Sequence, residues 1–159
     1  MAKILTASQI KDIAVVDPNF DIGYLDKIIE YTQLIDLKPI LTVDLYNDFI
    51  DNLGSLPVNY QYLLDNYIQY LLSYATLFNA IKKDVALQVS NQGVMTNRTD
   101  FSDSNKDYAT NKQLLTLADM CYTYQYDLGC YLIDNKTDYP LFDIDKITVD
   151  LKFNCFFGL

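Results

Sequence analysis

Apolar residues recur at helical spacing along most of the chain, and this pattern predicts a mainly α-helical protein. The first segment, LTASQIKDIAVVDPNFD, reads as a short helix. Thr6 or Ser8 can cap its start, and Asp17 with Pro18 ends it, because the residue before a proline is pushed out of helical geometry. Residues 20–41 continue with apolar positions at helical spacing.

Proline and glycine mark the next boundaries. The helix over residues 20–41 is expected to be interrupted near Pro39, and a further helix is expected to run from a cap at Thr42 to a stop at Gly54. Two long helices then follow, over residues 57–84 and from about Tyr108 to Asn135, each with one apolar stripe. These two helices are predicted to form the centre of the fold.

The stretch LQVSNQGVMTNRTD, which separates the two long helices, reads differently. Val85, Leu87 and Val89 alternate with polar or small residues, NQG supplies residues that tolerate positive φ, and VMTNRT returns as a second strand. The sequence therefore predicts a projecting β-hairpin over residues 85–99.

The C-terminal residues 140–159 are predicted to be a strand-forming tail. Apolar and polar residues alternate with period two over residues 147–157, as in a strand with one apolar face. That strand can pair within its own subunit or add to the sheet of a neighbour, and both arrangements stay open. The fold class expected for residues 1–159 is a single mainly α domain, a bundle of antiparallel helices with an inserted β-hairpin and a C-terminal strand.

The charge balance argues against a protein that reads nucleic acid sequence. The net charge is −9 at neutral pH, and Arg98 is the only arginine among 12 cationic residues. Such a reader needs a basic face for phosphates and arginine forks for guanine edges. The acidic balance has two possible explanations. It can simply keep the protein soluble, or it can suit a protein that lies near DNA without binding it tightly.

Catalytic chemistry has few candidates. The chain has no histidine, which removes the commonest general base and the commonest metal ligand. Three cysteines without a CxxC pair suggest neither a disulfide framework nor a zinc site, and fit a reducing cytosol. No segment reads as a signal peptide or a membrane span, so a place on the cytoplasmic side of any membrane is expected.

Two acidic stretches are candidates for a metal or acid–base site. Asp103, Asn105 and Asp107 occupy the first three ligand positions of a calcium loop, but the required glycine and glutamate are missing, so Asp107 is better explained as a helix cap. Asp143 and Asp145 have no second group to face them. No cofactor, metal or catalytic residue is expected.

Tyrosine is unusually abundant, with 14 copies, and nine of them, from Tyr60 to Tyr74 and from Tyr122 to Tyr131, lie in the two long helices at spacings that cannot all face one core. Some of these rings must lie at an edge or outside. Tyrosine is favoured at protein interfaces because it combines a large contact area with a polar tip. Tyrosines at the core boundary with hydrated hydroxyls are the alternative for any single ring.

The stretch LKPILTVDLYNDFI, followed by a long helix that leads into NQGV, resembles the small head-to-tail connector (neck or adaptor) proteins of tailed bacteriophages, especially those of crAss-like phages. The resemblance covers roughly residues 20 to 130, and Thr42 stands where that family often has glycine. The matching positions are Pro39, Leu41, Leu45 and Tyr46 in the first motif, and Asn91, Gly93 and Val94 in the turn.

The resemblance implies a non-enzymatic structural protein of the virion neck, made in the host cytoplasm. It would form a homo-oligomeric ring, dodecameric by the resemblance, with the portal protein above and the tail or further neck proteins below. DNA would pass through the ring without sequence-specific binding, and no membrane would be involved. The expected contact residues are Asn91, Gly93, Val94, Arg98, Phe101, Val149, Leu151 and Phe153, and the structural motif is Pro39, Leu45 and Tyr46.

A second class of function stays open. The chain can instead be a small non-virion binding module, such as a phage regulatory or host-takeover protein, that uses its tyrosine-rich face on one protein partner. An enzyme is the third and least favoured alternative, because no nucleophile, base or metal set can be assembled from these residues.

Overall fold

The computed structural model describes residues 2–14, 22–92 and 101–147, and every regular element in these ranges is helical. Two pairs of α-helices are each joined by a π-helical turn without a break in the chain, so α2, η1 and α3 follow one another, as do α5, η2 and α6. The elements are α1 (Ala7–Ala14), α2 (Ile22–Thr32), η1 (Gln33–Leu37), α3 (Lys38–Leu41), α4 (Val43–Asp51), α5 (Val58–Leu63), η2 (Leu64–Ile68), α6 (Gln69–Gln92), α7 (Phe101–Asp134), η3 (Lys136–Asp138) and η4 (Ile144–Lys146).

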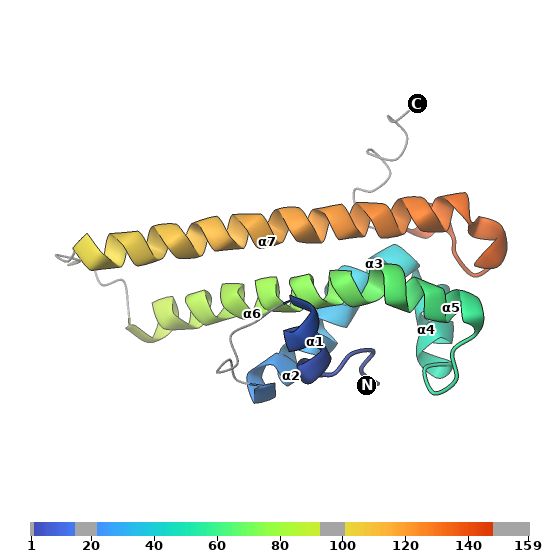
Figure 1. Ribbon diagram of the computed structural model, residues 1–159, viewed down its shortest axis with the longest axis horizontal. Helices are drawn as coiled ribbons and strands as arrows, with labels where there is room; N and C mark the ends of the chain where they lie inside the picture. The colour runs from blue at the N-terminus through green and yellow to red at the C-terminus, as the bar shows by residue number, and fades with distance from the viewer. Residues whose placement is uncertain (1, 15–21, 93–100, 148–159) are drawn as a thin grey trace, which may run out of the picture.

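The central element is α6, which lies between α7 on one side and α1 and α2 on the other (Figure 1). Helices α6 and α7 lie side by side and run in opposite directions. With 34 residues, α7 is about 51 Å long. Helices α4 and α5 lie near the end of the molecule where α7 finishes (Figure 1).

Burial on all sides explains the central place of α6. Between residues 71 and 80 only Tyr74 and Phe78 are more than slightly exposed. A helix that is apolar nearly all round must be covered nearly all round. The core therefore lies on both faces of this helix, with the largest fully buried side chains being Tyr139, Phe49, Phe142, Ile10, Leu25, Ile29, Leu37, Ile40, Leu41, Leu45, Leu63 and Ile68.

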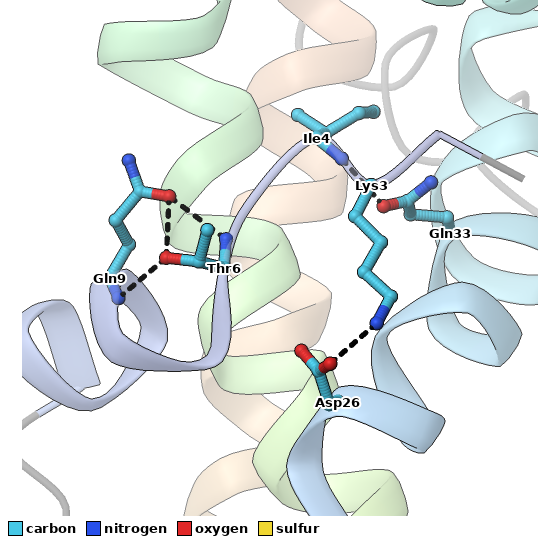
Figure 2. Close-up of polar contacts among 6 residues, drawn as sticks. All are labelled: Lys3, Ile4, Thr6, Gln9, Asp26 and Gln33. Atoms are coloured by element: carbon cyan, nitrogen blue, oxygen red, sulfur yellow. Dashed lines mark hydrogen bonds and ion pairs between the residues drawn. The ribbon is translucent and has the colours of Figure 1, made fainter. Parts of the chain in front are cut away.

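The start of α1 is fixed by a capping box, in which the residues before and after the first turn bond to each other. The backbone N–H of Gln9 donates to Thr6 Oγ1 at 3.3 Å, and the backbone N–H of Thr6 donates to Gln9 Oε1 at 2.9 Å (Figure 2). The expected cap at Thr6 is confirmed.

Polar contacts also hold the segment before α1 against the body. Lys3 Nζ lies 2.7 Å from Asp26 Oδ2 in α2, and the backbone N–H of Ile4 donates to Gln33 Oε1 at 2.8 Å (Figure 2). The fully buried Gln33 belongs to the first π-turn, so this turn joins the N-terminal segment to the core.

The interruption expected near Pro39 takes a different form. The widened turn η1 comes directly before α3, in which Pro39 is the second residue. Because proline has no N–H to donate to the preceding turn, a wide turn at this place removes the conflict without ending the helix. The chain bends one turn later, at Thr42.

The β-hairpin predicted over residues 85–99 is wrong. Residues 85–92 are the last turns of α6, residues 93–100 lie outside the described residues, and α7 begins at Phe101. An alternation of only three apolar residues does not distinguish a strand from a helix face. Here the helix continues because α7 packs beside α6.

Helix α7 also begins seven residues earlier than predicted. Asp103, Asn105 and Asp107 therefore lie inside a helix. Asp107 is not the N-cap, and the helical backbone excludes a calcium loop at these positions, because that loop requires a sharp turn between its ligands.

The predicted strand-forming tail over residues 140–159 is corrected for the part that the structure describes. Residues 140–147 form turns and the 3-10 helix η4, no strand occurs in the described ranges, and residues 148–159 lie outside them. Phe142 and Ile147 are buried, and Lys146 Nζ lies 3.0 Å from Asp44 Oδ2 in α4. The segment after α7 thus packs against the body of the protein. None of the described helices is both long and apolar enough to cross a membrane.

Thr42 adopts a backbone conformation that disfavours its own side chain. Its φ is 67° and its ψ is 162°, a region that only glycine adopts without strain, and a β-branched residue is especially disfavoured there. The Thr42 side chain is buried, its hydroxyl has no hydrogen-bond partner, and it does not cap α4 as predicted. The strain permits the bend between α3 and α4.

Replacing this residue should stabilise the protein. We expect Thr42→Gly to raise the free energy of unfolding by about 1 kcal/mol, since glycine adopts this conformation freely and removes an unpartnered buried hydroxyl. The matched control is Thr76→Gly, which also removes a buried, unpartnered hydroxyl but in the interior of α6. It should lower that free energy by about 1 kcal/mol or more. Urea denaturation of both variants checks this, and a destabilised Thr42→Gly would contradict it.

Candidate functional site

Two groups of side chains stand out as candidate sites, and each contains one of the π-turns. We call the first the polar cluster: Thr32, Asp36, Asn79, Lys82 and Cys121. We call the second the tyrosine seam: Tyr62, Tyr67, Tyr70 and Tyr74 on α5–η2–α6 with Tyr124 and Tyr131 on α7. A π-turn is rare and often occurs at functional sites, so each group is a candidate.

In the polar cluster, Asn79 of α6 holds two groups of the neighbouring helix. Its Nδ2 donates to Asp36 Oδ2 at 2.7 Å and to Thr32 Oγ1 at 3.2 Å. Burial raises the pKa of Asp36, while the hydrogen bond from Asn79 and the charge of Lys82 oppose this rise. The π-turn η1 therefore presents a carboxylate to the buried face of α6.

The thiol of Cys121, on α7, lies near the same carboxylate. Burial raises its pKa to about 12, and the charge of Asp36 adds to the effect. A thiol with such a pKa is protonated at neutral pH and is a poor nucleophile. No group of three or more metal-binding side chains comes together in the described ranges. The hydrogen bonds of the polar cluster fasten η1 to α6, which is a structural role.

The tyrosine seam is built from rings that stack across the junction of two helices. The Tyr67 and Tyr131 rings lie 4.6 Å apart between centroids, and the Tyr62 and Tyr131 rings 5.6 Å apart. Further along, the Tyr124 ring lies between Tyr70 at 5.7 Å and Tyr74 at 5.4 Å. Contacts of this kind stabilise by about 0.5–1.5 kcal/mol each beyond the buried area.

The seam continues into the core through further aromatic rings. Tyr139, which follows η3, lies 6.0 Å from Tyr131 and 6.1 Å from Tyr60, and Tyr60 stacks on Phe49 at 5.6 Å. Tyr139 Oη donates to the carbonyl of Asn59 at 2.9 Å, and burial raises its pKa. This inner part fixes the ends of α5 and α7 together.

The outer part of the seam is open to solvent and is acidic. Tyr62 is 48% exposed and Tyr70 36% exposed. Asp127 is exposed and lies three residues after Tyr124 and four before Tyr131, so it shares their side of α7 and lies between the two groups of rings. Its carboxylate contributes to a raised pKa at both Tyr67 and Tyr124, after burial and the neighbouring tyrosines. The raised pKa keeps the phenols of Tyr67 and Tyr124 protonated at neutral pH, so the seam offers aromatic faces and negative charge rather than an acid or a base.

The tyrosines that the sequence placed on two helices are therefore mostly packed on one another. The three- and four-residue spacing of Tyr67, Tyr70 and Tyr74 puts them on one side of the continuous helix formed by η2 and α6. What the sequence does not contain is the register that brings them opposite Tyr124 and Tyr131. Tyr122, on another side of α7, is 52% exposed and takes no part in the ring contacts of the seam.

The residues predicted to make contacts between subunits do not form a described site. Asn91 lies in α6 and Phe101 is the first residue of α7. The remaining six lie outside the described residues, and their role stays a prediction: Gly93, Val94, Arg98, Val149, Leu151 and Phe153.

The structure does bring the first motif together. Leu45 and Tyr46 of α4 are buried, and Pro39 lies on α3, just before the bend. Gln33 Nε2 donates to Tyr46 Oη at 3.4 Å, and Lys38 Nζ lies 5.5 Å from the centre of the Tyr46 ring. These residues hold the bend between α3 and α4 against η1.

The raised pKa of Asp36 makes stability depend on pH. An acid with a higher pKa in the folded than in the unfolded state costs stability once it ionises, so this cost is absent at low pH and appears as the pH rises through the folded pKa. We expect Asp36→Asn to be more stable than the natural protein at pH 7, with the difference shrinking towards pH 4. Thermal unfolding across this range measures it, and a constant difference would contradict it.

The thiol of Cys121 should resist alkylation. The rise of its pKa from 9.0 to about 12 lowers the thiolate fraction at neutral pH about a thousandfold. We expect iodoacetamide to modify Cys121 at least a hundredfold faster in urea than in the folded protein, in a variant with Cys130→Ser and Cys155→Ser. Similar rates in both states, followed by mass spectrometry, would contradict the buried position.

Comparison with known proteins adds one finding. No curated protein and no solved structure matches the chain. A family model, described as a family of unknown function (DUF6712), matches residues 37–148, which include the bend after Pro39, both partners of the tyrosine seam and η4. The chain therefore belongs to the family of unknown function DUF6712.

Proposed function

We propose that this protein is a structural component of a phage virion, a neck ring that joins the portal to the tail and extends the DNA channel. The observation that carries the proposal is the resemblance of LKPILTVDLYNDFI, with the long helix after it, to the head-to-tail connector proteins of tailed phages. The motif residues Leu45 and Tyr46 are buried at the bend, so they maintain the fold of the subunit.

The arrangement of the helices suits a ring subunit. A closed ring built from head-to-tail contacts needs two different, complementary patches on each subunit. The pair formed by α6 and α7 extends beyond α1 and α2 (Figure 1), whereas the opposite end carries α4, α5 and the segment after α7. The molecule thus has two unlike ends that can serve as two contact surfaces.

The charge of the chain suits a channel. A net charge of −9 at neutral pH with a single arginine gives DNA little to bind, so DNA could slide past acidic subunits without being held. We place no catalytic step in this protein.

A second candidate, a small non-virion module that binds one protein partner, is favoured by the open tyrosines. Tyr62 and Tyr70 expose large parts of their rings near Asp127, a carboxylate that makes no ion pair with any residue the structure describes. Exposed aromatic clusters of this kind are typical of protein interfaces.

Quantitative mass spectrometry of density-purified virions of the source phage tests the proposal. We expect the chain in intact particles, in a near-integral ratio to the portal protein, since a ring stacked on the portal has a fixed copy number. Its absence from intact virions would contradict the ring and favour the binding module. The portal protein itself serves as the internal standard for particle recovery.

A further inference from the structure

We propose that the outer part of the tyrosine seam is a docking surface for a segment of another protein that carries arginine or lysine side chains. The inference stands on the contacts and charges of the seam alone, so it holds whether or not the chain forms a neck ring. It concerns Tyr62, Tyr67, Tyr70 and Asp127.

The aromatic faces are held in place before any partner arrives. Tyr62 touches both Tyr67 and Tyr131, at centroid distances of 6.4 and 5.6 Å, and the Tyr70 ring lies 5.7 Å from that of Tyr124. Because these rings already pack on neighbours, a partner would not need to immobilise them. Exposed rings that are already ordered lose little conformational entropy on binding.

The two segments that form the seam carry side-chain charge of one sign, and lysines lie just beyond their ends, at Lys82, Lys112 and Lys136. The segments that form the seam, residues 58–81 and 113–135, contain no lysine and no arginine but include Asp65, Asp119, Asp127 and Asp134. The carboxylate of Asp127 is exposed and makes no ion pair with any described residue. Asp65 is exposed as well, and its side chain accepts a hydrogen bond from the neutral Gln61.

This combination selects a cationic partner. A guanidinium or ammonium group is attracted to the face of a tyrosine ring and to a carboxylate at the same time. Arginine fits better than lysine, because its planar group stacks on a ring while its N–H groups donate to a carboxylate. The same negative charge repels nucleic acid phosphates.

A second copy of this chain is a poorer occupant than a different protein. Each copy carries a net charge of −9, and the two segments of the seam would face another acidic molecule. Complementary potentials favour association, whereas facing charges of the same sign oppose it. The proposed occupant is therefore a basic segment of another protein.

Two pairs of matched variants distinguish binding at the seam from binding that depends only on the total charge of the protein. Asp127→Asn and Asp119→Asn remove the same charge from exposed positions of the same helix, but only Asp127 lies between the rings of the seam. Tyr62→Leu and Tyr122→Leu each remove an exposed ring and keep an apolar side chain, but only Tyr62 belongs to the seam. Thermal unfolding verifies that all four variants are folded.

The probe is a fluorescent octa-arginine peptide, compared with octa-lysine and with an uncharged peptide of the same length, by anisotropy at about 0.15 M salt. We expect Asp127→Asn and Tyr62→Leu each to weaken octa-arginine binding about two- to fivefold, as for exposed ion pairs and cation–π contacts. Asp119→Asn and Tyr122→Leu should leave it nearly unchanged, and octa-lysine should bind more weakly than octa-arginine.

Three results would overturn the proposal. Equal effects of Asp127→Asn and Asp119→Asn would mean that only total charge matters. Binding of octa-arginine no tighter than that of the uncharged peptide would remove the surface altogether. Self-association of the natural protein in sedimentation that Tyr62→Leu abolishes would make a second copy the occupant. None of these results depends on whether the chain is found in virions, so failure of the neck-ring proposal is measured separately.

Discussion

The antiparallel pairing of α6 with α7 is the constraint on which the rest of the structure depends. Helix α6 continues η2 and α5 without a break, and the contact of α7 with this continuous helix brings residues 62–74 opposite residues 124–131. The contact is aromatic rather than aliphatic along this part, with Tyr67 and Tyr131 stacked at 4.6 Å. Stacked rings keep their polar tips near water while burying their faces, which allows one junction to be both a core boundary and an open surface.

The other elements are arranged around that pair. The hydrogen bonds of Asn79 fasten η1 to α6, and the Tyr139 ring and its bond to Asn59 fasten the segment after α7 to α5. The strained backbone at Thr42 lets α3 and α4 meet at a bend between these contacts. Local strain of this kind persists only where surrounding contacts hold it, and the buried Leu41 and Leu45 on either side do so.

Much of the helical pattern could be predicted from the sequence, because caps and apolar stripes are local signals. Thr6 caps α1 as expected, and two long helices occur where period 3.6 is sustained. The hairpin failed because Val85, Leu87 and Val89 fit a strand locally, whereas the neighbouring helix α7 favours continuation of α6. Local propensity cannot predict a structure that depends on tertiary contacts.

The candidate site was visible in the sequence only in part. The number of tyrosines indicated an interface. Which rings stack and which stay exposed depends on how the two helices are aligned with each other. That alignment cannot be predicted from the residue spacing within either helix. The π-turns η1 and η2 could not be predicted from the spacing of apolar residues either. Each of them changes which side chains face the core. Thr42 was noted as the place where glycine was expected, and its positive φ gives that substitution its physical meaning.

The measurement that tests this account most directly is a double-mutant cycle on Tyr67 and Tyr131, each replaced by leucine, with the free energy of unfolding from urea denaturation. The stacked pair predicts a coupling of about 0.5–1.5 kcal/mol, because either replacement removes the same ring contact. The cycle on Tyr67 and Tyr122, which is outside the seam, should be additive. Additive effects for Tyr67 and Tyr131 would mean that ring stacking does not hold α6 and α7 together, and would contradict the account.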